Sequence, residues 1–173
     1  VINAGGEIRG GGYKVTLNDA GGATYIFSCV GTIGATGSHG TFSIDITGGS
    51  VTRPINEAGA GSITNLTINN AQTYTLQYGL TLLGNLTITA GTLDTARASD
   101  SVDQTLTVTL DIHIDGTLTG NTSAISARSV HIDGTFTHNG VLTVTGIAAT
   151  NYAFQNLGTW TPATSQRTTF TGG

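Results

Sequence analysis

The chain has 173 residues, of which 9% are charged and 38% are hydrophobic, and its formal net charge is -4. The carboxylates are sparse and no basic patch can hold a phosphate backbone, so the composition argues against nucleic-acid binding. No run approaches the roughly 18 apolar residues of a membrane helix, so membrane insertion is not expected either. The 26 Gly and 33 Thr, many alternating with apolar residues, predict a single all-β domain of strands and tight turns.

Residues 1–62 are the least regular part of the chain, because pairs and triplets of glycine interrupt them. Between the glycines lie three segments of strand length, two that alternate at residues 13–17 and 42–47 and one apolar run at residues 25–30. We predict that residues 1–62 form a glycine-rich start or cap of the same domain, whose regular part is residues 63–173.

Two features of this first part have a structural interpretation. The stretch Gly31 to Gly40 has glycine at every third position, but no helix start follows it, as a phosphate-binding loop would require. We therefore interpret it as a flexible loop or a tight corner. Cys29 is the only cysteine, and its apolar neighbours favour a small buried hydrophobe over a reactive or intermolecular thiol.

In the second part of the chain the alternation becomes regular, with apolar residues at every second position in segments 66–68, 74–82 and 86–88. The phase then slips by one residue. A slip of one would turn the core side chains outward, so we predict a bulge or corner at Gly91. Residues 94–104 contain the only charged cluster and no apolar period, which predicts a loop that leaves the regular structure.

The most informative stretch contains an internal repeat. The phrase His113 to Thr119 (HIDGTLT) returns as His131 to Thr137 (HIDGTFT), displaced by 18 residues with one change. In each copy the apolar residues and Gly share one parity and the polar residues hold the other, which is the period of a half-buried strand. The apolar parity continues from Leu106 to Leu118, which is longer than most strands and predicts a run that bends without losing phase.

A shorter unit, Gly-Thr followed by a large apolar residue and then Thr, Ser or Asp, recurs along the chain at Gly40, Gly91, Gly116, Gly134 and Gly158. The spacings of 51, 25, 18 and 24 give a loose period of about 18 to 25 residues. Repeats of this length predict a parallel β-solenoid, in which two near-identical strands are successive rungs of a coil. The alternative is an antiparallel β-sandwich, but hairpin signals are few, with Asn139-Gly140 the one strong turn pair.

Three phrases carry a resemblance to a known group of proteins: GNLTITAGTLD at residues 84–94, IDGTLTGN at 114–121 and IDGTFTHNGVLTVTG at 132–146. They resemble the degenerate right-handed β-helix repeats of bacterial cell-surface and secreted proteins, the adhesin and filamentous-haemagglutinin-like group. The resemblance covers residues 63–173. It implies a right-handed parallel β-helix and an extracellular or cell-surface location, and it carries no catalytic motif.

If the two HIDGT copies stack in register, His113 lies beside His131 and Asp115 beside Asp133, all facing outward. Two His and two Asp in one patch could hold a divalent metal ion, since imidazole and carboxylate are ordinary ligands. We favour a solvent-exposed ladder in which the histidines offset the repulsion of the stacked carboxylates, because metal ligands usually converge from different directions. We therefore expect no cofactor, and these four residues are the candidates if a metal binds.

Secreted β-helices include polysaccharide lyases and hydrolases, which need paired carboxylates or an arginine beside an acidic cluster. The candidates here would be Asp94, Arg97, Asp100, Asp103 and Arg128. Both arginines lie on predicted loops, and one Trp, five Tyr and five Phe leave almost no aromatic lining for a sugar groove. We predict that the chain is not an enzyme and keep a carbohydrate-binding or polysaccharide-degrading β-helix as the alternative.

A Thr-X-Thr pattern recurs in the predicted strands, and stacked threonines on a flat solenoid face are a way in which some β-solenoids bind ice. It involves Thr87, Thr105, Thr107, Thr117, Thr135, Thr143, Thr159 and Thr169. Threonine is a favoured outward residue in any strand, and a loose period would spoil a flat lattice, so ice binding is a second alternative.

The function that we expect is structural. A solenoid has open ends whose unpaired backbone groups invite further strands. We therefore predict an extracellular β-solenoid segment of a cell-surface adhesin, or a subunit of a self-assembling extracellular filament. The expected partners are other copies of the chain, stacked end to end or by edge strands, and surface glycans.

Overall fold

The computed structural model describes residues 7–8, 14–17, 27–29, 32–33, 43–48, 53–57, 63–146, 152–164 and 166–171. Within these ranges the chain forms strands and no helix, so nothing described there is a helix long and apolar enough to cross a membrane. The strands are β1 (Glu7–Ile8), β2 (Lys14–Leu17), β3 (Phe27–Cys29), β4 (Thr32–Ile33), β5 (Ser43–Ile46), β6 (Arg53–Glu57), β7 (Asn65–Leu76), β8 (Leu80–Leu82), β9 (Leu86–Asp94), β10 (Leu106–Val108), β11 (Asp111–Ile114), β12 (Thr117–Asn121), β13 (Ile125–Ala127), β14 (Ser129–Ile132), β15 (Thr135–His138), β16 (Val141–Val144), β17 (Phe154–Asn156), β18 (Thr159–Pro162) and β19 (Arg167–Phe170).

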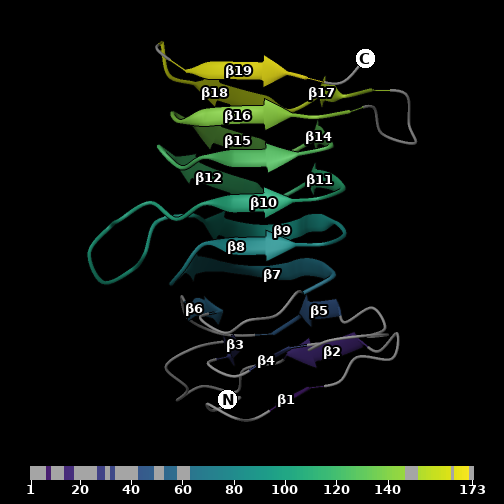
Figure 1. Cartoon of the computed structure of the whole chain (residues 1–173), viewed down its shortest axis with the longest axis vertical. Coiled ribbons are helices and arrows are strands. Elements are labelled where there is room, and N and C mark those ends of the chain that lie inside the picture. Colours follow the sequence, from purple (N-terminus) through teal and green to yellow (C-terminus); the bar gives the residue numbers. More distant parts are fainter. Residues whose placement is uncertain are drawn as a thin grey trace.

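Apart from the β1–β4 pair, the strands stack into three columns of parallel neighbours (Figure 1). Column I consists of β8, β10, β13, β16 and β19. Column II consists of β2, β5, the first part of β7, the first part of β9, β11, β14 and β17. Column III consists of β3, β6, the last part of β7, the last part of β9, β12, β15 and β18. The long strands β7 and β9 pass from column II to column III.

All pairs between the named strands are parallel, and the one antiparallel bridge in the described ranges joins Ala96 to Asp103 within a loop. Parallel neighbours need a connection of about a dozen residues or more, and the loose period supplies it. The all-β prediction is confirmed, and the antiparallel sandwich is wrong. Asn139-Gly140 follows β15 and leads into β16, which belong to different columns, so this pair turns a corner and closes no hairpin.

The internal repeat stacks like on like, as predicted. His113 pairs with His131 between β11 and β14, and Leu118 pairs with Phe136 between β12 and β15. The single parity from Leu106 to Leu118 is divided among β10, β11 and β12, which are separated by two short bends. The run therefore bends without losing its phase.

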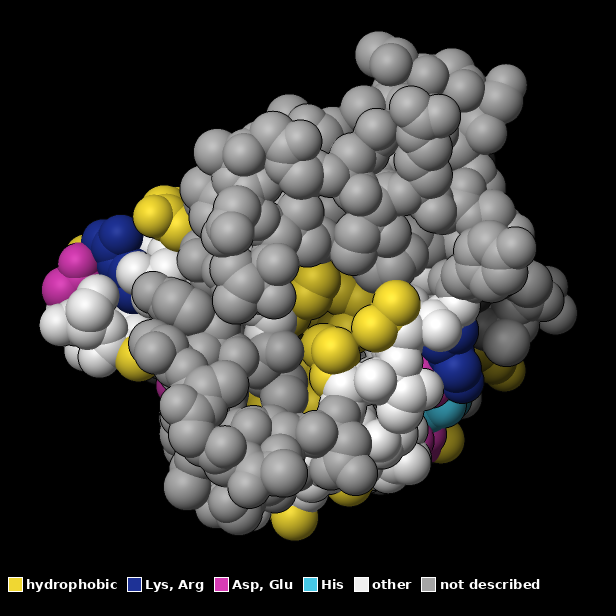
Figure 2. All heavy atoms as spheres, turned by 90° about the horizontal axis from the view of Figure 1, so that it is seen from below, with side chains coloured by type: hydrophobic (Ala, Val, Ile, Leu, Met, Phe, Trp, Pro, Cys, Tyr) yellow, Lys and Arg dark blue, Asp and Glu magenta, His cyan; other side chains and the backbone are white. Residues whose placement is uncertain are grey.

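One hydrophobic core takes side chains from all three columns. Figure 2, which looks along the stack from the N-terminal end, shows hydrophobic side chains in the middle and charged side chains towards the rim. The segment 74–82 departs from the prediction of one continuous alternation. Tyr78 is 44% exposed, because residues 77–79 form the corner between β7 and β8.

Gly91 marks a corner, as the phase slip predicted. It has a φ of +78°, a conformation that side chains rarely adopt, and it lies within β9 where the strand passes from column II to column III. The register between β7 and β9 shifts at the same place. The phase slip falls at this corner, so the apolar residues that follow Gly91 still face the core.

The loop predicted at residues 94–104 is confirmed. Residues 95–105 connect β9 to β10 and project away from the columns on the left of Figure 1. Loops of this kind absorb the variable part of each repeat, so the strands keep their register. Of the predicted loop Gly31 to Gly40, only β4 is described. The side chain of Cys29 lies outside the described part of the structure.

Candidate functional site

The outward face of column II carries a strip of polar side chains. In register along the column these are Asp45, Thr67, Thr87, His113, His131 and Gln155. At the N-terminal end of the strip Lys14 forms an ion pair of 2.6 Å with Asp45. The alternation of each strand puts these groups outside because the residues beside them point into the core.

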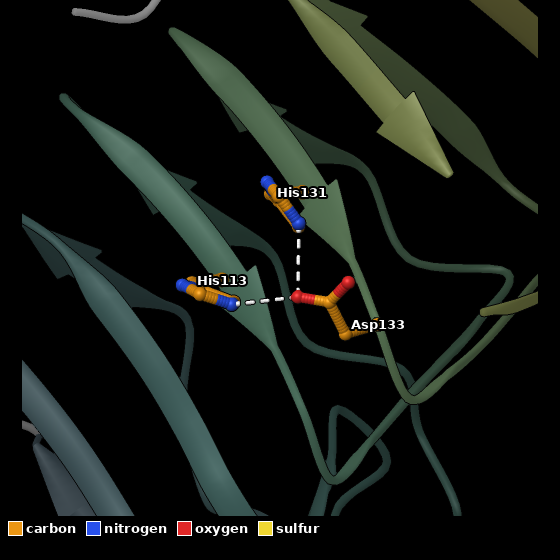
Figure 3. Close-up of side chains that lie close together, drawn as sticks. All are labelled: His113, His131 and Asp133. Carbon is orange, nitrogen blue, oxygen red and sulfur yellow. Dashed lines mark hydrogen bonds and ion pairs between the residues drawn. The ribbon is translucent and has the colours of Figure 1, made fainter. Parts of the chain in front are cut away.

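His113 and His131 form the centre of a cluster on this strip. Their rings lie 4.7 Å apart between centroids, with their planes tilted by 35°. Asp133 follows β14 at the corner, and its Oδ2 lies 3.1 Å from Nε2 of His113 and 2.9 Å from Nε2 of His131 (Figure 3). Asp115 follows β11, and its Oδ1 lies 3.1 Å from Nε2 of His113. The structure thus brings together the four residues that the repeat predicted.

The Asp133 carboxylate is the electrostatic centre of this cluster. Loss of solvation disfavours its charge, but the neighbouring imidazoles of His113 and His131 favour the carboxylate more strongly. The pKa of Asp133 therefore lies below its usual value of 3.8. Asp133 is ionised at neutral pH, and its charge is available to a cation.

Beside the cluster lies a second polar group that the sequence did not single out. The carboxylate of Asp111 accepts two hydrogen bonds from Arg128, at 3.0 and 2.6 Å, and one from the hydroxyl of Ser129 at 2.7 Å. Partial burial opposes the charge of Asp111, yet the bonds from Arg128 and Ser129 hold its pKa below the usual 3.8. The sequence could have predicted this contact, because Asp111 and Ser129 each precede a repeated histidine by two residues.

A hollow of about 230 Å³ adjoins both groups. It is lined by Asn85, Leu86, Thr87, Asp111, Ile112, His113, Ser129 and His131. A second hollow on the same strip, nearer the N-terminus, has about 310 Å³ and is lined mainly by polar residues of β2, β5, β7 and β9. The polar face of column II therefore carries both of these hollows.

The residues considered for polysaccharide chemistry do not converge. Arg97 forms an ion pair of 2.7 Å with Asp100 within the projecting loop, and Arg128 is held by Asp111 on column II. Asp94 accepts hydrogen bonds from Asn121 and from the backbone of Ala96.

The last of these candidates, Asp103, accepts hydrogen bonds from the backbone and the hydroxyl of Thr122. Each candidate carboxylate or arginine thus has a partner that fixes a loop or a corner. None of these three carboxylates lines either of the two hollows on column II.

Column III carries two rows of polar residues in register, and of these Thr75 is buried. The first row is Thr73, Thr92, Thr117, Thr135 and Thr159, and the second is Thr75, Asp94, Thr119, Thr137 and Thr161. The threonines keep this register although the period of the sequence is loose, because the extra residues leave through loops.

A buried polar corner also escaped the sequence analysis. His138 is fully buried, stacks on Phe136 with ring centroids 5.4 Å apart, and its Nε2 donates to the carbonyl of Ser123 at 2.8 Å. Its Nδ1 accepts from Gln166 at 3.0 Å. Both contacts suit one neutral tautomer. Burial lowers the pKa of His138 below 6.5, and the bond to Ser123 only partly offsets this.

Fold and site together define an all-β protein of stacked parallel strands with an exposed histidine–aspartate cluster on one face. No family model, no curated protein and no solved structure matches the chain. Its function is therefore argued from the fold and the site.

Proposed function

We propose that the chain is a right-handed parallel β-solenoid module of an extracellular structural protein, either a segment of a cell-surface adhesin or a subunit of a filament. The order of the strands supports the coil, since the chain visits columns I, II and III in the same order with β10–β11–β12, β13–β14–β15 and β16–β17–β18. The proposal includes no catalytic role, because the candidate residues for catalysis serve loops and corners.

The observation that carries this proposal is the surface at the C-terminal end of the stack. Within the described ranges β17, β18 and β19 have a parallel neighbour on one side only. Phe154 lies against Trp160 at 4.7 Å and against Phe170 at 6.3 Å between ring centroids, and Phe170 is 56% exposed. Unpaired backbone groups beside exposed aromatic rings favour the addition of further strands.

Sedimentation velocity and negative-stain microscopy over a wide range of concentrations test this proposal. We expect assemblies that lengthen with concentration, and we expect Phe170→Lys to reduce them because a charge opposes burial of the end. A matched control is Tyr152→Lys, which places the same charge on a similarly exposed aromatic that makes no ring contact in the described structure. Monomers at every concentration would exclude a filament subunit.

The adhesin alternative has its own test. The purified chain is applied to glycan-coated and cell-coated surfaces, and binding is compared with that of a variant in which the polar strip is changed, Thr87→Lys. We expect specific retention that the variant loses. Equal retention by the wild type, the variant and an unrelated protein would remove the adhesive role.

A second candidate function rests on the Thr rows of column III. Rows of threonine hydroxyl and methyl groups in register on a parallel sheet favour an ordered solid surface such as ice as the ligand. Thermal hysteresis of the purified chain is the measurement, with Thr137→Lys on the array and Thr143→Lys on column I as matched variants. We expect the first variant alone to abolish hysteresis; if the wild type shows none, ice binding is excluded.

A further inference from the structure

The cluster of His113, His131 and Asp133 has the arrangement of a ligand set. Each residue offers one ligand atom, and the three atoms all lie within 4.8 Å of one another. The two imidazoles come from neighbouring strands, whereas the carboxylate comes from the corner after β14 (Figure 3). The ligand atoms therefore approach a common point from different directions, which a simple outward ladder would not achieve.

The two distances that join Asp133 to the imidazoles are close to those of a tetrahedral transition-metal site. With metal–nitrogen and metal–oxygen bonds of about 2.0–2.2 Å, two ligand atoms of a tetrahedral site lie roughly 3.3–3.5 Å apart. The carboxylate oxygen of Asp133 lies 3.1 Å from one imidazole nitrogen and 2.9 Å from the other. These two nitrogen–oxygen distances need to lengthen by only a few tenths of an ångström. The side chains of His113 and Asp133 are 46% and 37% exposed, so both have room to adjust.

A polar atom aimed into the cluster has no hydrogen bond. Nε2 of His131 is buried, and the described part of the chain offers it no hydrogen bond of acceptable geometry, although Asp133 is close. A buried nitrogen in this position is unfavourable unless something else accepts its lone pair or its proton. A metal ion would accept the lone pair.

The charge of the cluster also favours a cation. The carboxylates of Asp133 and Asp115 each have an oxygen 3.1 Å from Nε2 of His113. A divalent ion bound among these groups would offset the charge of the two carboxylates. Calcium requires about six to eight oxygen ligands, whereas imidazole nitrogen suits zinc and copper.

We propose that His113, His131 and Asp133 bind one divalent transition-metal ion of the zinc class, with the remaining coordination position open towards solvent. The ion would join β11 to β14 and so tie two successive turns of the stack together. This proposal stands independently of the structural role proposed above, because it rests on the geometry of the cluster alone.

Isothermal titration of the purified metal-free chain with Zn²⁺ tests the site. We expect one ion per chain, and we expect His113→Ala and His131→Ala each to weaken binding at least about tenfold, since each removes one ligand. Asp133→Asn should weaken it as well. His39→Ala and Asp100→Asn are the controls, because they remove one imidazole and one carboxylate that do not belong to the cluster. Both should bind Zn²⁺ as the wild type does. Ca²⁺ should not compete.

A stability readout accompanies the titration. Zn²⁺ should raise the Tm of the wild type and of both controls, and leave the Tm of the double variant His113→Ala/His131→Ala unchanged, because an ion that binds only the folded state stabilises it. If either histidine variant fails to fold, imidazole proton NMR of the wild type replaces it, with two of the four histidines expected to shift. Absence of Zn²⁺ binding, or equal binding by the double variant, would overturn the proposal.

Discussion

Gly134 lies where the bend before β15 closely approaches the bend before β12. A Cβ at this position would overlap the backbone oxygens of Gly116 and Asp115. We expect Gly134→Ala to lower the free energy of unfolding by about 1–3 kcal/mol, because backbone cannot move aside without breaking the register of β12 and β15. Denaturant titration measures the change.

Gly146→Ala is the matched control for this prediction. A Cβ there would lie 3.1 Å from Cγ of Arg128, a flexible side chain that can yield. We expect a change within about 0.5 kcal/mol. If both variants lose the same free energy of unfolding, lack of space beside Gly134 is not the cause of its loss.

His138 predicts a specific dependence of stability on pH. Its pKa in the folded chain is lowered below 6.5 by burial, so the unfolded chain takes up a proton that the folded chain does not. Stability is therefore unaffected above about pH 7.5 and falls as the pH drops from there through 6.5 towards the folded pKa. The lowered pKa of Asp133 acts in a separate window, because its contribution is lost only well below pH 5.

The variant His138→Asn isolates this contribution. Between pH 7 and pH 5 we expect its free energy of unfolding to fall less steeply than that of the wild type, although its stability at pH 7 is lower. Denaturant titrations at four or five pH values give both slopes. Parallel slopes would assign the pH dependence to other groups.

Sequence reasoning found some of these residues and missed others for a physical reason. The repeat identified His113 and His131 because identical phrases at a fixed offset stack on each other. It did not identify the partners of His138, because Ser123 and Gln166 come from corners 15 and 28 residues away. Corners carry the variable part of the period, so no fixed offset points to their contacts.

The projecting loop between β9 and β10 is a small hairpin, with a hydrogen-bonded neck and an exposed tip. At the neck, backbone bonds join Arg97 to Val102 and Gln104 to Thr95, and Asp103 receives two bonds from Thr122. The tip, residues 98–101, is exposed and adds nothing to the core. Register therefore depends on the neck.

Replacing residues 98–101 by Asn-Gly tests this division. We expect a change in the free energy of unfolding of a few tenths of a kcal/mol, because loop length has a weak effect on closure entropy. Asp103→Ala should cost about 1 kcal/mol, since Thr122 loses its acceptor. Denaturant titration compares the two, and a larger loss from the tip replacement would contradict the assignment.

Strand positions were more predictable than the columns to which they belong. Alternation in β11, β14 and β16 marks each strand because one face is buried. The neighbour of each strand depends on how many residues separate two strands of the same column, and loops make this number irregular. Only for the near-identical copies could the pairing be predicted from the sequence. Phase slips such as the one at Gly91 reveal corners only where the apolar pattern is strong on both sides.

In a stack of parallel strands, stability is approximately the sum of contributions from the strands and from the interfaces between neighbouring strands. Strands in the middle, such as β12, have parallel neighbours on both sides, whereas β17, β18 and β19 have one in the described ranges. We expect amide hydrogen exchange to be slowest in β9 to β15 and faster in the last three strands. Mass spectrometry of peptic peptides measures it, and uniform protection would mean that the end is covered.

Phe136 and Trp160 occupy equivalent places on β15 and β18, but Phe136 is fully buried and Trp160 only partly so. We expect Phe136→Ala to cost about 3–5 kcal/mol of stability. Trp160→Ala should cost less although it removes more atoms, because in the described ranges the core continues past Trp160 on one side only. Denaturant titration at low protein concentration gives both values. If the cost of Trp160→Ala rises with concentration until it equals that of Phe136→Ala, a second copy completes the core at this end, and the stack continues from one chain into the next.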